Sequence, residues 1–257
     1  MVWQTIFAYR LNFAMWRLRT VILRLTSYFF WYAVYRFNKQ VGSYNESMML
    51  TYILTGSILH SLVLTTRSAR TAIHIASGDL NNFLIKPLNY FTRTLFLDLG
   101  GKAANLFFLF LEMIAIFLIL KPPFFIQTNI IYLLGFIIIS VLSLFLFFYL
   151  SLIISLTAFW YPEHNGWPAR FLFNVSNRFL SGSLIPLDVL PVSIFNFLRF
   201  LPTSYFIFFP LQIYLGKISQ SEILAGFFIM LFWVFILRIL VKLIWSKGLK
   251  NYTAVGI

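Results

Sequence analysis

Residues 103–121 read AANLFFLFLEMIAIFLILK and contain one carboxylate, Glu112, in the middle of an almost unbroken apolar run. A helix rises about 1.5 Å per residue, so roughly 20 apolar residues cross the ~30 Å hydrocarbon core of a bilayer. An ionisable group at that depth is costly unless it has a partner. The stretch therefore predicts a membrane-spanning helix in which Glu112 pairs with a buried base such as Arg178, contacts a substrate, or is protonated against a neighbouring helix.

The composition indicates that the whole chain is a polytopic membrane protein. Of its 257 residues, 60% are hydrophobic and 11% are charged, and its 32 phenylalanines exceed what one soluble core of this size buries. The net charge of +13 is typical of cytoplasmic loops and lipid headgroup contacts, so we expect membrane lipids and no nucleic acid as partners. The absence of cysteine excludes disulfides, thiolate metal sites and a cysteine nucleophile.

Hydropathy predicts an all-α membrane protein with six transmembrane helices. The expected spans are residues 21–35, 48–64, 95–120, 130–160, 168–183 and 223–241. After the fifth span, residues 184–210 are too apolar for a solvated loop, but Pro186, Pro191 and Pro202 would interrupt a continuous helix. A re-entrant outer helical hairpin before the last span satisfies both conditions.

The distribution of Lys and Arg predicts the orientation of the chain. Basic residues gather before the first span, between the second and third spans, and at the end: Arg10, Arg17, Arg19, Arg24, Arg67, Arg70, Lys86, Arg93, Arg238, Lys242, Lys247 and Lys250. By the positive-inside bias, both termini and residues 65–94 are cytoplasmic. Residues 1–20 are amphipathic as a helix, so we expect either an N-terminal interfacial helix on the inner leaflet or an ordinary juxtamembrane extension.

Residues 65–94 form the longest polar segment, and we expect two short helices in it. The first covers residues 66–76 and stops at Ser77-Gly78, and the second covers residues 79–85 and stops before Pro87. Their Ile, Leu and Phe side chains argue against disorder. Exposed apolar residues on short cytoplasmic helices indicate a docking surface.

Polar groups inside the predicted spans are further candidates for function. Asn174, Asn177 and Arg178 lie at i, i+3 and i+4, so they share one helical face and either line a path or hydrogen-bond between helices. Asp98 and Lys102 stand four residues apart, a spacing that favours a local ion pair that anchors the third span.

Several catalytic patterns are missing from the sequence. It has no Gly-x4-Gly-Lys-Ser/Thr motif to cradle ATP phosphates and no Gly-x-Ser-x-Gly nucleophile elbow. Its histidines, His60, His74 and His164, lie in separate regions without the spacing of a zinc helix. We therefore expect a non-catalytic subunit with no metal and no cofactor of its own.

Two motifs resemble those of the ABC-2 type transporter permeases, and more narrowly a bacterial group of uncharacterised ABC transport permease components. The first, after the second span, is Ser77-Gly78-Asp79-Leu80-x3-Leu84-Ile85-x-Pro87-Leu88. The second, after the fifth span, is Ser181-Gly182-x2-Ile185-Pro186-Leu187-x3-Pro191, followed by Leu201-Pro202. The order of these motifs among the predicted spans extends the resemblance over nearly the whole chain.

The resemblance implies one permease domain over residues 1–257 in the inner (plasma) membrane, exporting an amphipathic, lipid-like or drug-like substrate. It also implies a dimer with an identical or related permease, bound to an ABC ATPase dimer that holds ATP and Mg. Residues 65–94 would be the coupling segment and residues 184–210 the outer gate. The residues expected in these roles are Arg70, His74, Gly78, Asp79, Leu80 and Leu84 for coupling, Glu112, Asn174, Asn177 and Arg178 for the translocation path, and Ile185, Pro186, Leu187 and Pro191 for the gate.

Two other functional classes fit the sequence less well. An ATP-independent secondary carrier or channel would be indicated by inverted internal repeats, but the halves of the chain show no self-similarity. An intramembrane lipid-modifying enzyme would need clustered His, Asp or Ser side chains at a membrane face, and the sequence has no such cluster.

Overall fold

The computed structural model describes residues 10–252, and these residues form helices joined by loops. The long helices are α2 (Arg10–Phe37), α3 (Glu46–Val63), α6 (Tyr90–Leu120), α7 (Ile130–Leu156) and α11 (Gln220–Asn251). The short helices are α4 (Arg70–Ala76), α5 (Asn81–Leu84), α8 (Trp167–Leu180), α9 (Val192–Leu198) and α10 (Phe208–Tyr214). Single 3-10 turns are η1 (Arg67–Ala69), η2 (Thr157–Phe159), η3 (Glu163–Gly166), η4 (Leu187–Val189) and η5 (Pro202–Tyr205).

Four helical stretches are long and apolar enough to cross a membrane. They are Glu46–Ala76, Tyr90–Leu120, Ile130–Phe159 and Gln220–Asn251. The helix α2 has 28 residues but carries several arginines, and α8 has only 14 residues, a rise of about 21 Å. The all-helical membrane fold is therefore confirmed within the described residues, whereas the prediction of six spans is not.

The predicted interfacial helix and the predicted hairpin also differ from what the structure contains. Residues 10–20 are the first turns of α2 and continue without a break into the expected first span, while residues 1–9 lie outside the described part. Residues 184–210 contain η4, α9, η5 and the start of α10. The helix α9 is largely exposed, whereas α10 is buried against α7 and α3, so a re-entrant hairpin over 184–210 is not confirmed.

The long helices begin at side chains that cap their first turns. Asn45, Asn89 and Asn129 accept hydrogen bonds from first-turn N–H groups of α3, α6 and α7. Ser219 and Glu222 form a reciprocal capping box at the start of α11. These local signals fix where each apolar run becomes a helix, so the helix starts follow directly from the sequence.

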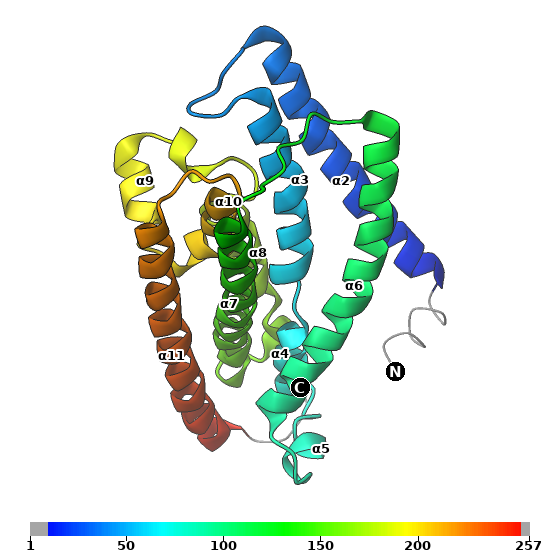
Figure 1. Ribbon diagram of the computed structural model, residues 1–257. Helices are drawn as coiled ribbons and strands as arrows, with labels where there is room; N and C mark the ends of the chain where they lie inside the picture. Colours follow the sequence, from blue (N-terminus) through cyan, green and yellow to red (C-terminus); the bar gives the residue numbers. More distant parts are fainter. Residues whose placement is uncertain (1–9, 253–257) are drawn as a thin grey trace.

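The helix α7 lies in the centre of the molecule, with α11 along one side and α3 and α6 on the other (Figure 1). We call the end that carries α4, α5 and the last turns of α11 the α5 end, and the opposite end, with α9 and the α2–α3 loop, the α9 end (Figure 1). One buried cluster fills the molecule between α3, α7 and α10, and a second fills the α5 end between α4, α7 and α11.

Candidate functional site

The predicted coupling segment is anchored to the body of the protein at the α5 end. Ala72, Ile75 and Leu80 are buried against α7. The Tyr90 ring stacks on Trp245 of α11, with ring centroids 5.2 Å apart. Because the segment shares this cluster with α7 and α11, a force applied to it reaches the long helices directly.

The expected coupling residues divide into exposed and buried groups. Arg70, Asp79 and Leu84 are exposed, but Leu80 is completely buried and supports the segment from within. His74 is partly buried, and its Nδ1 lies 2.9 Å from the hydroxyl of Tyr90.

The backbone turns sharply at Gly78, where φ is +76°, and the Gly78 carbonyl accepts a hydrogen bond of 2.8 Å from the Tyr252 hydroxyl. This conformation favours glycine, which explains the Ser-Gly stop that the sequence predicts between the two short helices. The bond to Tyr252 fixes the turn to the chain just beyond α11.

Apolar side chains project from the tip of this segment beyond the residues that the sequence singled out. Ile85 is 82% exposed and Leu88 is 65% exposed, beside the projecting helix α5 (Figure 1). The Arg93 guanidinium lies 4.5 Å from the centre of the Phe83 ring next to them. The signal for these positions was present in the apolar residues flanking Pro87, so the exposed apolar surface extends beyond the predicted coupling residues.

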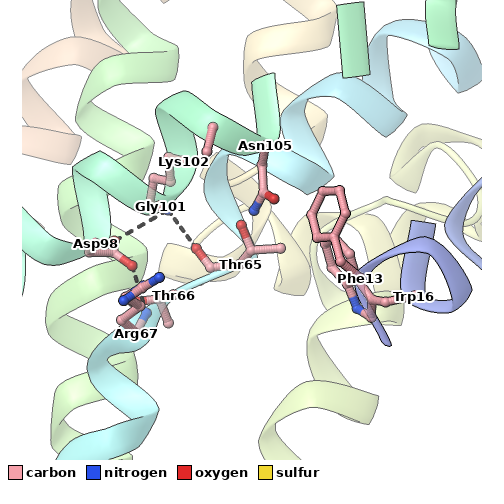
Figure 2. A pocket seen from close by; sticks show the side chains of 10 residues that line it. Phe13, Trp16, Thr65, Thr66, Arg67, Asp98, Gly101, Lys102 and Asn105 are labelled. Carbon is pink, nitrogen blue, oxygen red and sulfur yellow. Dashed lines mark hydrogen bonds and ion pairs between the residues drawn. The ribbon is translucent and has the colours of Figure 1, made fainter. Parts of the chain in front are cut away.

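Asp98 and Lys102 of α6 hold the junction between α3 and η1 (Figure 2). The Lys102 ammonium donates 2.6 Å hydrogen bonds to the carbonyls of Leu62 and Thr65, at the end of α3. The Asp98 carboxylate accepts a 2.6 Å bond from the backbone N–H of Arg67, the first residue of η1. The two side chains also form the predicted i,i+4 ion pair, at 3.5 Å.

Asp98 and Lys102 therefore do more than anchor α6 locally, because they also contact two neighbouring segments. Both side chains are buried, and they satisfy carbonyls at the end of one helix and an amide at the start of the next. A cavity of about 280 Å³ lies beside the junction and is also lined by Phe13 and Trp16 of α2 (Figure 2). The junction is therefore a contact point for α2, α3 and α6 together.

Glu112 forms a buried ion triad that joins α6 to α2. Its carboxylate accepts hydrogen bonds from Arg17 at 2.6 Å and from Arg24 at 2.8 Å. Glu112 therefore pairs with a base, as one of the expectations had it, but Arg178 is not that base, because both carboxylate oxygens are bonded to arginines of α2. The triad holds two cations and one anion, and the remaining positive charge lies on the α2 side.

The other predicted path residues, Asn174, Asn177 and Arg178, line a groove between α2, α3 and α8. Two adjoining cavities, of about 320 and 210 Å³, form this groove and share part of their lining. The shared residues are Thr20, Leu23, His60, Ser61 and Arg178. We call this space the α2–α3–α8 groove.

The groove extends from the α5 side of α3 toward the predicted gate. The larger cavity reaches Thr65 at the end of α3, and the smaller one reaches Ile53 and Leu184. Thr65 and Ile53 are 12 positions apart in the sequence, which corresponds to about 18 Å along a helix. The sequence placed polar groups on α8 but gave no sign of the hydroxyls that α2 and α3 contribute.

The predicted gate residues are tied to two loops at the α9 end. Pro186 and Leu187 are buried, whereas Ile185 and Pro191 are exposed. The carboxylate of Asp188, next to them, accepts a hydrogen bond of 2.8 Å from the Tyr44 hydroxyl and one of 2.9 Å from the Lys217 ammonium. Sequence analysis missed this network because Tyr44 lies 144 positions, and Lys217 lies 29 positions, from Asp188.

Burial dominates the electrostatics of this network. It raises the pKa of the Tyr44 phenol well above its ordinary value, and the Asp188 charge adds to that rise. It also lowers the pKa of Lys217, although the hydrogen bond and the charge of Asp188 act in the opposite direction. Tyr44 is therefore a neutral hydrogen-bond donor to Asp188 at neutral pH.

Comparison with known proteins identifies one family. The family model described as ABC-2 family transporter protein matches residues 21–256 of the chain. Comparison with curated proteins and with solved structures gave no match. The match covers most of the chain, including the predicted coupling segment, Glu112, the α3 and α8 residues of the groove and the predicted gate residues. The chain therefore belongs to the ABC-2 transporter family.

Proposed function

We propose that the chain is the permease subunit of an ABC exporter, powered by a separate ATPase dimer and paired with a second permease that is identical or related. The observation that carries the proposal is the α5 end, where a well-anchored segment presents exposed apolar side chains. Ile73, Leu84, Ile85 and Leu88 are exposed there, and Asp79 is exposed beside them. A rigid segment with a small apolar tip suits docking to a partner protein.

The contacts within the chain support a route from the docking segment to the groove. The segment begins at η1, whose first amide is bonded to Asp98 of α6. The same helix holds the end of α3 through Lys102 and holds α2 through Glu112. Because α2 and α3 both border the groove, movement of α6 relative to η1 would change its width. ATP-driven closure of the partner subunits would supply that movement.

The groove supports an amphipathic, lipid-like or drug-like substrate. Its lining combines hydroxyl and amide groups with apolar side chains such as Leu23, Leu64 and Phe147. A purely apolar molecule would leave the polar groups unpaired, and a purely polar one would not fill the apolar part. In this proposal the substrate would pass along the groove toward Leu184 and the gate at the α9 end, which is the direction of export.

The distribution of charge supports an inner-membrane protein with the α5 end in the cytoplasm. Arg70, Lys86 and Arg93 lie in or beside the docking segment, and Lys247 and Lys250 lie in the last turns of α11. The positive-inside bias assigns such an end to the cytoplasm. The N- and C-termini would then be cytoplasmic, and the gate would face outward.

Replacing Ile85 with Asp tests the docking surface directly. The variant puts a charge on a side chain that is 82% exposed and contributes nothing to the core, so the fold is retained while the apolar contact is lost. Ile126→Asp is the matched control, because Ile126 is 71% exposed in the α6–α7 loop at the α9 end. After tagged purification in mild detergent, Ile85→Asp should recover about tenfold less ATPase subunit than the Ile126→Asp control.

Two results would contradict the proposal. Equal recovery of the ATPase by both variants, at equal expression, would place docking elsewhere on the chain. Recovery of the unmodified chain without any nucleotide-binding subunit would instead favour the ATP-independent carrier.

A further inference from the structure

The cations of the α2–α3–α8 groove are not balanced by acids. Arg19, Arg24 and Arg178 line the groove, and its described lining contains no carboxylate. Arg24 shares the Glu112 carboxylate with Arg17, but neither Arg19 nor Arg178 has a carboxylate within ion-pair distance among residues 10–252. Both side chains are exposed, so their charges are accessible to an anionic ligand in the groove.

Of the two cations, Arg178 gives the stronger indication of a binding site because it lies far along α8 from the η3 side. It lies 11 residues after Trp167, the first residue of α8, and is therefore about 16 Å along the helix from the η3 side, which packs on α4. Cations elsewhere in the helices have polar partners: the buried Lys102 has three carbonyls, and the partly buried Arg170 donates a 2.6 Å bond to the Ser155 hydroxyl. Arg178 instead faces the shared part of the two cavities.

Asn177, next to Arg178, adds an unsatisfied acceptor. Its side chain is 3% exposed and lines the larger cavity. The amide nitrogen donates a 2.7 Å bond to the Phe173 carbonyl, but the amide oxygen has no partner among the described residues. A buried oxygen of this kind is normally paired, so the groove can hold a ligand that donates a hydrogen bond at this point.

The rest of the lining fits the other parts of such a ligand. Thr20, Ser61 and Asn174 offer hydroxyl and amide groups around the cations. Trp16 and Leu64 offer apolar surface at the same level. The ligand therefore has an anion, a hydrogen-bond donor close to it, and an apolar part.

We infer that the α2–α3–α8 groove binds an anionic amphiphile whose headgroup carries hydroxyl groups, with Arg178 and Arg19 holding the anion and the Asn177 amide oxygen accepting a headgroup hydroxyl. This inference rests on the proposed permease function and names the substrate class. A phosphodiester that bears a polyol headgroup has the required chemistry. Arg178 supplies two parallel donors to its phosphate oxygens.

Photo-crosslinking with three lipids tests each part of this inference. The purified chain is reconstituted in phosphatidylcholine nanodiscs that contain traces of a probe with a diazirine next to the headgroup. The probes are phosphatidylglycerol, phosphatidylethanol, which has the same charge but no hydroxyl, and phosphatidylcholine. Mass spectrometry compares adducts in the groove with adducts on the exposed face of α11, which carries Phe228, Phe232 and Phe235.

Phosphatidylglycerol should label the groove about tenfold more than phosphatidylcholine, the ratio that one charge-assisted hydrogen bond supplies. Arg178→Gln should remove this preference, and Arg178→Lys should restore part of it. Arg36→Gln is the matched control, since Arg36 is exposed and its guanidinium contacts only Tyr32 among the described residues. Asn177→Leu should equalise phosphatidylglycerol and phosphatidylethanol without restoring phosphatidylcholine.

The outcomes separate this inference from the proposed function. Equal labelling of the groove by charged and zwitterionic probes would overturn the anionic substrate class and leave the groove as a path. Labelling of the groove no higher than that of α11, with every probe, would overturn both the substrate class and the groove as a path for lipid-like molecules. A preference that survives Arg178→Gln in a folded, monodisperse variant would remove Arg178 from the site.

Discussion

At the scale of single residues, charged side chains with little exposure join α6 to α2 and to the end of α3. Lys102 has its ammonium group surrounded by carbonyls at the end of α3, and Glu112 has both of its carboxylate oxygens bonded to arginines of α2. Each is on α6, so one helix carries both contacts. Removing one partner of a buried ion pair is strongly destabilising, because the other charge is left unpaired.

Lys102→Met should therefore destabilise the protein by about 3 kcal/mol. The methionine keeps the length of the side chain, but the end of α3 loses its donor and Asp98 keeps only the Arg67 amide. Thermal unfolding in detergent measures the loss, with Lys242→Met on the exposed face of α11 as the control. A loss below about 1 kcal/mol, the range of an exposed ion pair, would contradict a supporting part for Lys102.

The sequence predicted that Glu112, Asp98 and Lys102 need partners, but it did not predict all of these partners. The need of Glu112 for a partner follows from one carboxylate in an apolar run, and the i,i+4 spacing of Asp98 and Lys102 gave their pairing. The partners of Glu112 and the carbonyls around Lys102 could not be predicted. The arginines lie about 90 positions upstream, and a backbone carbonyl has no signature in the sequence.

At the scale of helices, the helices that have strong local sequence signals were predicted, and the contacts between distant segments were not. The ends of α3, α6, α7 and α11 lie within a few residues of most predicted span ends, because long apolar runs flanked by Asn or Ser caps leave few alternatives. The helix α8 ends early, at Leu180, where Gly182 turns the chain with φ +74°. The burial of α10 depends on packing against α7 and α3, which hydropathy does not encode.

Asp188→Asn should loosen the predicted gate at the α9 end. The change removes the charge that Tyr44 and Lys217 share and should lower the free energy of unfolding by about 1–2 kcal/mol. Since the chain has no cysteine, Leu187→Cys provides a reporter at a position that is 1% exposed. The thiol should react with an impermeant maleimide faster in the Asp188→Asn background. Unchanged reactivity would mean that the network does not hold this segment closed.

The same network has a pH dependence with a definite sign. The pKa of Lys217 is lowered from 10.5 in the folded protein, so just below pH 10.5 the unfolded chain binds more protons. The free energy of unfolding should therefore rise with pH in that interval. Lys217→Met should remove this part of the slope, and an unchanged slope in the variant would contradict the assignment to Lys217.

At the scale of the whole molecule, the two regions with proposed functions lie at different places on one set of helices. The proposed docking surface is at the α5 end (Figure 1), and the groove borders α2, α3 and α8. The helix α6 contacts η1, where the docking segment begins, through Asp98, and it contacts α2 through Glu112. The positions of these residues in the sequence predicted the two regions separately. The connection between them depends on how the helices pack, so only the structure revealed it.

The ion triad also determines the order in which the chain is expected to enter the bilayer. The ribosome delivers α2 about 90 residues before Glu112, and α2 is not among the helices that are apolar enough to partition by themselves. Each arginine near a helix centre opposes partitioning by about 2.5 kcal/mol. We therefore expect α2 to remain beside the translocon until α6 arrives with its carboxylate, so that the first helix inserts later during synthesis than its position in the chain would suggest.

Stalled nascent chains test this order. A glycosylation acceptor placed in the α2–α3 loop reports whether that loop has crossed microsomal membranes. Chains long enough to expose residue 127 outside the ribosome should be glycosylated, and chains that end before residue 105 should not. Glu112→Gln in the longer chain should behave like the shorter chain. Equal glycosylation of all three would mean that α2 inserts without its partner.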